Sequence, residues 1–300
     1  MASEIGSRGA NPRRKCALSS GGERRWTETE AGACIRRSVD EGIVRRQLAV
    51  NGVDALRPIG SLTMNTPMQT KETPPTPSPA LADVNPDTTQ RVVVETASMT
   101  WEPSPSGTVW RKPLYRQGGE SGPVTSLVRY APGGAFPEHA HPQGEEILVL
   151  DGVFSDEHGD YPAGTFLMNP HGSRHSPRSQ TGCTLFVRLR QYPGTDRPRL
   201  VEDTTATDSW RPGLVDGLGV RPLYSQGGYP ESVALVRWAP GTHFQRHTHW
   251  GGEEILVLEG EFADEHGRYP EGTWIRSPHM SQHTPFSDAG CLIYVRVGGL

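Results

Sequence analysis

Residues 145–165 read EEILVLDGVFSDEHGDYPAGT, and residues 253–273 read EEILVLEGEFADEHGRYPEGT. The two segments are identical at 16 of 21 positions, at an offset of 108 residues. Flanking segments repeat as well: LVRYAPGG (127–134) corresponds to LVRWAPGT (235–242), and PLYRQGG (113–119) to PLYSQGG (222–228). Solenoid units are only about 20–50 residues long. The longer period therefore indicates a duplicated domain, with copies at 91–200 and 201–300.

Each copy is composed of short strand-like segments separated by turn residues. In the first copy, residues 127–130 form an apolar segment that ends at Pro132-Gly133, and the longer apolar run 145–154 is followed by the turn sequence DEHG. The glycine of that sequence supplies the positive φ that tight hairpin turns require. No stretch shows the apolar period of an amphipathic helix. The pattern predicts an all-β protein, either a barrel or a sandwich.

All eleven histidines of the chain lie at or after His139. Two corresponding sets of three histidines and one glutamate stand out: His139, His141, Glu145 and His175 in the first copy, and His247, His249, Glu253 and His283 in the second. Side chains alternate along a strand, so residues 139, 141 and 145 point to one side if that segment is extended. Glu146 is a rival for Glu145, but its parity places it on the outer face. Buried imidazoles and carboxylates without partners are costly, so we predict that each set binds one metal ion.

The first 90 residues differ in composition from the two copies. Residues 1–63 carry ten Arg and one Lys against seven acidic residues, and residues 65–90 contain six prolines. No apolar core follows the basic residues, as a signal peptide would require. We interpret residues 1–90 as a disordered extension, Arg-rich and then Pro-rich. Alternatively, translation begins at Met64.

Composition excludes several classes of protein. The net charge of −4 argues against a general nucleic-acid binder, which needs clustered basic side chains. No run approaches the ~20 apolar residues that a membrane-spanning helix needs. The four cysteines, Cys16, Cys34, Cys183 and Cys291, form no CxxC pair. They predict no disulfide framework, and the cytoplasm is the expected compartment.

The two copies resemble the cupin superfamily, whose fold is a jelly-roll barrel also called a double-stranded β-helix or RmlC-like fold. Its first motif, G-x5-H-x-H-x3-4-E-x6-G, is matched at 133–152 and 241–260. Its second motif, G-x5-P-x-G-x2-H-x3-N, is matched at 164–179 and 272–287, except that Ser179 and Ser287 replace the Asn and Met280 replaces the second Gly. The repeated EEILVL and DEHG phrases resemble the cupin domain of ChrR-type anti-sigma factors and related dioxygenase-like cupins. We therefore expect two tandem cupin barrels after the extension.

Three functions are compatible with these residues. Four protein ligands leave two positions open on an octahedral ion, which suits non-haem Fe(II) oxygenation or Lewis-acid chemistry by Mn, Ni or Zn. We expect two divalent ions per chain, Fe(II) or Zn before Mn or Ni, and an enzyme of the dioxygenase type that acts on a small keto or phenolic compound. The resemblance to ChrR implies an alternative, a zinc-binding regulatory sensor. The third alternative is a bicupin that binds a ligand without turnover.

The expected partners follow from the same resemblance. Anti-sigma factors of the ChrR type have an N-terminal helical domain with its own His/Cys zinc site. This chain has no histidine before residue 139, and Cys16 and Cys34 lie 18 residues apart. A sigma factor is therefore not expected as a partner. A small-molecule ligand or substrate is expected, and the cupin resemblance implies a homodimer.

Overall fold

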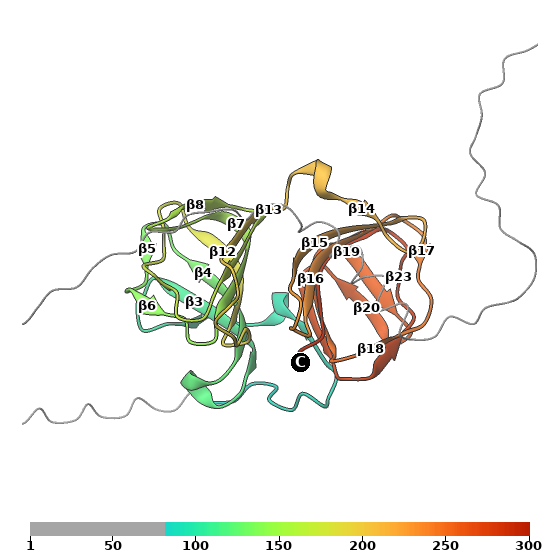
Figure 1. The fold of residues 1–300 in the computed structure, drawn as a ribbon, viewed down its shortest axis with the longest axis horizontal. Coiled ribbons are helices and arrows are strands. Elements are labelled where there is room, and N and C mark those ends of the chain that lie inside the picture. Colours follow the sequence, from blue (N-terminus) through green and yellow to red (C-terminus); the bar gives the residue numbers. More distant parts are fainter. Residues whose placement is uncertain (1–81) are drawn as a thin grey trace, which may run out of the picture. The chain divides into compact units, whose positions relative to one another are not determined.

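The structure is a computed structural model that describes residues 82–300. The Arg-rich segment, the alternative start at Met64, Cys16 and Cys34 lie outside the described residues. Residues 82–300 contain two barrels, which Figure 1 shows in green to yellow for the first and in orange to red for the second. Both are built almost entirely of strands, with three short 3₁₀ helices at η1 (Thr96–Ser98), η2 (Gly119–Ser121) and η3 (Thr207–Ser209). The prediction of two all-β cupin-like barrels is confirmed.

The first barrel contains a ten-stranded sheet whose main path runs β13-β9-β7-β12-β4-β3-β2. A separate pair, β6 with β10, closes one end. The strands are β2 (Glu102–Pro103), β3 (Val109–Arg116), β4 (Val124–Tyr130), β5 (Gly134–Ala135), β6 (His139–Ala140), β7 (Glu145–Asp156), β8 (Gly159–Pro162), β9 (Thr165–Asn169), β10 (Arg174–His175), β11 (Arg178–Ser179), β12 (Cys183–Leu189) and β13 (Leu200–Asp203).

The second barrel repeats this path as β1-β21-β19-β24-β16-β15-β14, with β18 paired to β22. Its strands are β1 (Val92–Glu95), β14 (Arg211–Pro212), β15 (Leu218–Ser225), β16 (Ser232–Trp238), β17 (Thr242–His243), β18 (His247–His249), β19 (Glu253–Asp264), β20 (Gly267–Pro270), β21 (Thr273–Ser277), β22 (Ser281–His283), β23 (Phe286–Ser287) and β24 (Cys291–Val297). Within residues 82–300, no helix is long and apolar enough to cross a membrane.

The DEHG sequence forms the predicted hairpin in both barrels. Strand β7 turns into β8 with Asp156 opposite Gly159, and β19 turns into β20 with Asp264 opposite Gly267. Gly152, inside β7, has a φ of +73°, and a side chain there would lie 2.1 Å from the carbonyl oxygen of Gly182. Glycine is therefore required where β7 bends past the neighbouring loop.

The two copies exchange their first strands. Strand β1 belongs to the first copy but pairs with β21 of the second barrel, with Val92 opposite Arg276. Strand β13 belongs to the second copy but pairs with β9 of the first barrel, with Leu200 opposite Met168. The boundaries 91–200 and 201–300 therefore describe the sequence repeat, whereas each barrel is completed by a strand from the other copy.

Matching threonine contacts hold both exchanged strands in place. After β1, the hydroxyl of Thr96 donates to the carbonyl of Gly272 at 2.7 Å, and after β13 the hydroxyl of Thr204 donates to the carbonyl of Gly164 at 2.6 Å. The exchange therefore repeats in detail in the two barrels.

Both faces of the long strands β7 and β19 are buried. Ile147 and Val149 lie in the core inside the first barrel. Leu148, between them, belongs to a separate core that also contains Leu256 and Trp274 of the second barrel. Apolar residues on both faces explain why the EEILVL segments read as continuous apolar runs rather than alternating ones.

Glu146, predicted to face outward, points into this second core and is 1% exposed. Its carboxylate accepts hydrogen bonds from Tyr192 and, at 2.5 Å, from Tyr294 of the second barrel. The equivalent Glu254 accepts a hydrogen bond from the Trp274 indole at 2.7 Å and lies 2.7 Å from a guanidinium nitrogen of Arg188. Burial raises the pKa of Glu146, against the opposing effect of Arg188. These carboxylates thus belong to a buried polar network between the barrels.

Residues 82–90, which the sequence places in the extension, contact both barrels. Val84 exchanges two backbone hydrogen bonds with Arg116, each 2.9 Å long. The guanidinium of Arg276 in the second barrel donates to the carbonyls of Asn85 at 2.8 Å and Asp87 at 2.9 Å. This part of the Pro-rich segment is therefore held by backbone hydrogen bonds, which the composition does not indicate.

The Arg188–Glu254 pair provides a test of the buried network. Replacing Arg188 with Met should lower the free energy of unfolding by about 3–5 kcal/mol, because it leaves the Glu254 carboxylate buried without its partner. The control is Arg268→Met, which removes exposed ion pairs to Glu261 and Asp288 and should cost less than about 1 kcal/mol. Chemical denaturation measures both variants. Equal losses would contradict the assignment of the network as a buried interface.

Candidate metal centre

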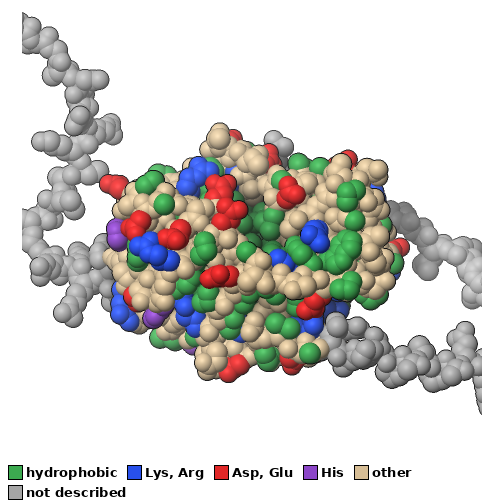
Figure 2. All heavy atoms as spheres, turned by 180° about the vertical axis from the view of Figure 1, so that it is seen from behind, with side chains coloured by type: hydrophobic (Ala, Val, Ile, Leu, Met, Phe, Trp, Pro, Cys, Tyr) green, Lys and Arg blue, Asp and Glu red, His purple; other side chains and the backbone are tan. Residues whose placement is uncertain are grey.

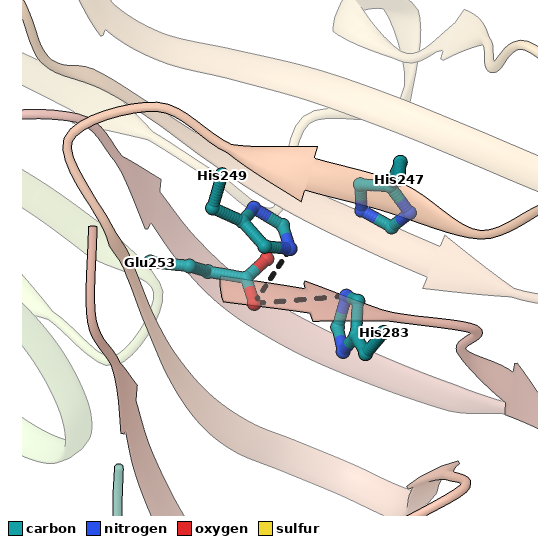
Figure 3. A group of neighbouring side chains, drawn as sticks. All are labelled: His247, His249, Glu253 and His283. Carbon is teal, nitrogen blue, oxygen red and sulfur yellow. Dashed lines mark ion pairs between the residues drawn. The ribbon is translucent and has the colours of Figure 1, made fainter. Parts of the chain in front are cut away.

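Short strand pairs at one end of each barrel bring the predicted histidines together. His139 on β6 lies directly opposite His175 on β10, and His247 on β18 lies opposite His283 on β22. Figure 3 shows His247, His249, Glu253 and His283 converging from three strands.

The path of the chain between the histidines and the glutamate differs from the extended strand that the parity argument assumed. In the first barrel a turn follows His141, with Gln143 at a φ of +60° and Gly144 at +74°, and the Gly144 amide donates to the His141 carbonyl. The turn ends β6 and starts β7 in a new direction. The parity of Glu145 over Glu146 still holds within β7, because Glu145 faces the barrel interior and Glu146 faces the other barrel.

In the second barrel, one ligand atom from each of the four predicted residues lies within 4.8 Å of the others. A carboxylate oxygen of Glu253 is 3.4 Å from Nε2 of His249 and 3.8 Å from Nε2 of His283. This spacing is close enough for all four groups to contact a single ion.

In the first barrel, the same limit of 4.8 Å is met by the three histidines, His139, His141 and His175. Glu145 lies beside two of them, with its Oε2 atom 3.4 Å from Nε2 of His141 and 3.6 Å from Nε2 of His175. The amide of Asn169 donates to the same oxygen at 2.9 Å. The Glu145 carboxylate is therefore held in place by a neighbour, whereas Ser277 occupies the position of Asn169 in the second barrel.

Several atoms in these clusters are buried without a hydrogen-bond partner. They are Nε2 of His141, His249 and His283, and one carboxylate oxygen of Glu253. An unpartnered buried polar atom costs free energy, and a divalent ion would satisfy all of these atoms at once. The residues present therefore fit a metal ion with three nitrogen ligands and one oxygen ligand.

Hydrogen bonds at Nδ1 orient the imidazoles so that Nε2 faces the cluster. Nδ1 of His139 is 2.8 Å from the carbonyl of Pro137, and Nδ1 of His247 is 3.0 Å from the carbonyl of Gln245. A carbonyl can only accept, so each Nδ1 carries the proton and each Nε2 keeps a free lone pair. This is the tautomer that ligates a metal through Nε2.

Burial keeps several of the imidazoles neutral. It lowers the pKa of His141 to about 3 and that of His249 to about 2, with further lowering by the neighbouring histidines. Burial also lowers the pKa of His247 to about 4. Neutral imidazoles are the form that binds metal, so these residues are prepared for ligation at neutral pH.

His175 and His283 differ because each has an aspartate behind it. Burial alone would lower the pKa of His175, but Asp156 and the charge of Glu145 raise it overall. Nδ1 of His175 is 3.5 Å from Oδ2 of Asp156, and Nδ1 of His283 is 3.3 Å from Oδ2 of Asp264. The sequence reading assigned these aspartates only to the hairpin turn. Their identity in both copies was the signal that could have revealed a second role.

A cavity of about 60 Å³ extends from the first cluster into the barrel. Most of its wall is apolar, and the polar contributions come from Arg111, Tyr130, His139, Glu145 and His175. The remaining lining residues are Val109, Val128, Phe136, Ile147, Phe154, Pro177, Leu185, Val187 and Leu189. The arrangement is that of a small-molecule site, with a few polar groups at one end of an apolar pocket.

The fold and these clusters define a protein with two cupin barrels. The chain belongs to the family of the ChrR Cupin-like domain, which matches residues 89–193 and 199–300. No curated protein matches the chain.

Solved structures with the same fold include a candidate dioxygenase from Nostoc punctiforme, with 18% identity and a TM-score of 0.58 over 71% of this chain and 84% of that one. Protein Ylba from E. coli gives 14% identity and a TM-score of 0.56 over 74% and 95% of the two chains. The salicylate 1,2-dioxygenase of Pseudoaminobacter salicylatoxidans, solved as adducts with gentisate, gives 11% and 0.53 over 73% and 82%. At these identities the likeness is one of fold.

Metal content tests the two clusters separately. We expect one equivalent of divalent metal in each barrel, so the variant with both His139 and His141 replaced by Ala should lose one equivalent because half of its ligands are gone. Replacing His247 and His249 with Ala should remove the other. Elemental analysis of purified protein measures this. The control is His158→Ala with His266→Ala, which changes two histidines of the hairpin turns and should leave the content unchanged. Retention of full metal content by either ligand variant would contradict the assignment.

Proposed function

We propose that this protein is a metal-dependent enzyme of the dioxygenase type that acts on a small keto or phenolic compound. The observation that carries the proposal is the position of the first cluster, with His139, Glu145 and His175 at the wall of an apolar cavity. Bound Fe(II) would supply redox chemistry with O₂, and Mn, Ni or Zn would supply Lewis-acid chemistry.

The residues of the chain have distinct roles in this proposal. His139, His141, His175 and Glu145 hold the ion, and their single negative charge leaves a divalent ion with a net charge of about +1. Asp156 fixes the orientation of His175 from behind. The apolar side chains of the cavity exclude bulk water and leave room for a compact ligand, which strengthens electrostatic interactions inside the site.

The family match supports a second candidate function. The ChrR Cupin-like domain is named for a regulator, and a zinc ion bound by all four ligands of a cluster would have a filled tetrahedral sphere. A zinc-binding sensor of this kind would need no cavity beside the metal. The cavity next to the first cluster therefore favours the enzyme over the sensor.

Oxygen uptake tests the proposal. Protein loaded with Fe(II) should consume O₂ when given a panel of β-diketones and hydroxyaryl ketones, and the His139→Ala/His141→Ala variant should lose at least about 99% of that rate because it lacks half of its metal ligands. An oxygen electrode measures the rate, with His158→Ala as the control. Iron-loaded wild-type protein that consumes no O₂ with any compound of the panel would overturn the proposal. Zinc in protein purified without added metal would favour the sensor.

A further inference from the structure

The two barrels differ in the interior despite their close sequence similarity. The register of the strands defines which positions are equivalent: Val109 lies opposite Tyr130 in the first barrel, and Leu218 lies opposite Trp238 in the second. Two residues further along, Arg111 lies opposite Val128, whereas Val220 lies opposite Val236. At this interior position the first barrel thus has a guanidinium group and the second an isopropyl group.

Arg111 is half-buried and lines the cavity beside the first cluster. Its guanidinium carbon lies 5.7 Å from the centre of the Phe136 ring, which forms part of the same wall. The Arg111 charge is near enough to contribute to lowering the pKa of His139. A positive charge at this place would add to that of a bound divalent ion.

A second difference reinforces the first. Tyr130 lines the cavity of the first barrel, and the larger Trp238 takes its place in the second, where it is 6% exposed. Trp238 packs against Phe262 with their ring centres 5.6 Å apart. The second barrel therefore fills this part of its interior with an indole ring and carries no charge at the position of Arg111.

We infer that the first barrel is the ligand-binding barrel and that Arg111 selects a compact compound with a carboxylate group. A guanidinium presents its N–H groups in a planar fork that matches the two oxygens of a carboxylate. The cavity volume of about 60 Å³ corresponds to only a few water molecules, since one water needs ~10–15 Å³. The ligand class is thus a short-chain keto acid. This inference rests on the proposed metal site of the first barrel and does not require turnover.

Two keto compounds of nearly equal size separate the effect of charge from that of shape: 2-oxobutanoate, which carries a carboxylate, and 2,3-pentanedione, which has an acetyl group in its place. Calorimetric titration of zinc-loaded protein, which is redox-inert, should give one 2-oxobutanoate site per chain. Arg111→Gln should weaken 2-oxobutanoate binding by about 10-fold to 100-fold, because a charge-assisted hydrogen-bond pair is lost. Binding of 2,3-pentanedione should change by less than about 3-fold.

Two further variants complete this experiment. Arg111→Lys, which keeps the charge, should recover part of the 2-oxobutanoate affinity, and Val220→Ala in the second barrel should leave it unchanged. Equal weakening of both compounds by Arg111→Gln, or equal binding of both by the wild-type protein, would overturn the inference. Because the measurement uses zinc and no O₂, absence of dioxygenase activity would leave the result intact.

A second inference comes from the exchanged strands. Arg91, next to β1, belongs to the first copy, yet its guanidinium lies 3.1 Å from Oδ2 of Asp264 and 2.7 Å from the hydroxyl of Tyr269 in the second barrel. The same oxygen of Asp264 is the one that faces Nδ1 of His283. Arg91 thus reaches the metal cluster of the opposite barrel through one carboxylate.

The reciprocal contact is present in the first barrel. Arg199, next to β13, donates to the hydroxyl of Tyr161 at 2.8 Å and lies 3.9 Å from Oδ2 of Asp156. Asp156 is in turn fixed by the Tyr161 hydroxyl at 2.9 Å and by the backbone amide of His158 at 2.7 Å. An arginine from the second copy therefore completes the support of His175 in the first barrel.

We propose that Arg91 and Arg199 are positioning residues that make each metal site dependent on the other copy. The arginine holds the aspartate, the aspartate orients the histidine, and the histidine presents Nε2 to the ion. Direct partners of metal-ligating histidines change metal affinity by about 10-fold to 100-fold when removed. An arginine one step further out should have a smaller effect, about 3-fold to 10-fold.

Zinc affinity of proteins with a single remaining site tests the cross-connection. The His247→Ala/His249→Ala protein retains only the first site, and there Arg199→Met should weaken zinc binding while Arg91→Met should not. The His139→Ala/His141→Ala protein retains only the second site, and there the effects should be reversed. Competition with a chromophoric chelator measures the affinities, with Asp156→Asn and Asp264→Asn as positive controls.

Rescue by lysine and the stability of the metal-free protein separate positioning from folding. Arg199→Lys and Arg91→Lys should recover most of the zinc affinity, and the unfolding midpoint of metal-free protein should not follow the loss of affinity across the Met and Lys variants. An arginine that affects the site of its own copy, or both sites equally, would overturn the proposal. So would Met variants that leave both affinities unchanged.

Discussion

The burial of both faces of β7 and β19 is the constraint on which the rest of the structure depends. One face of each strand lines the interior of its barrel, and the other packs in a core shared by the two barrels. Adjacent glutamates consequently have opposite roles. Glu145 faces the histidines, and Glu146 accepts hydrogen bonds from tyrosines between the barrels. A shift of one residue in the register of β7 would exchange these roles, since side chains alternate along a strand.

The shared core also explains why buried charges are concentrated away from the metal clusters. Arg188, Arg276 and Arg296 are each at most 2% exposed and lie close to Glu146, Glu254 or the backbone of residues 85–87. Charges at such depth are tolerated only when paired or hydrogen-bonded. On the face shown in Figure 2, by contrast, acidic and basic side chains are interspersed, as is usual for a solvated surface. The specificity of the contact between the barrels therefore resides in polar groups within an apolar surround.

Duplication has preserved the candidate ligands while changing their surroundings. The histidines and glutamates, the aspartates behind them and the arginines next to the exchanged strands occur in both barrels. The interior positions held by Arg111 and Tyr130 have become Val220 and Trp238. The turn residue Gly172 has become Met280, which keeps a φ of +65°. Similar clusters beside different interiors are the pattern expected when two copies keep a common site chemistry and divide its use.

The sequence alone determined the fold class, the duplication and the proximity of the eight candidate ligands, because strand alternation and motif spacing are local properties. It also indicated the right parity within β7. It failed at the segment between His141 and Glu145, where Gln143 and Gly144 form a turn that the alternating pattern does not reveal. It also assigned residues 82–90 to the extension, since backbone hydrogen bonds such as those of Val84 leave no trace in side-chain composition.

Only the tertiary structure decided which barrel each first strand joins. The segments VVVE (92–95) and LVED (200–203) have the same character, and β9 and β21 offer equivalent edges, so no local pattern distinguishes exchange from pairing within a copy. The tertiary structure likewise decided that Asp156 and Asp264 stand behind metal-facing histidines and that Arg91 and Arg199 reach across. These contacts join residues far apart in sequence, and long-range pairing is set by the packing of the whole chain rather than by its local periodicity.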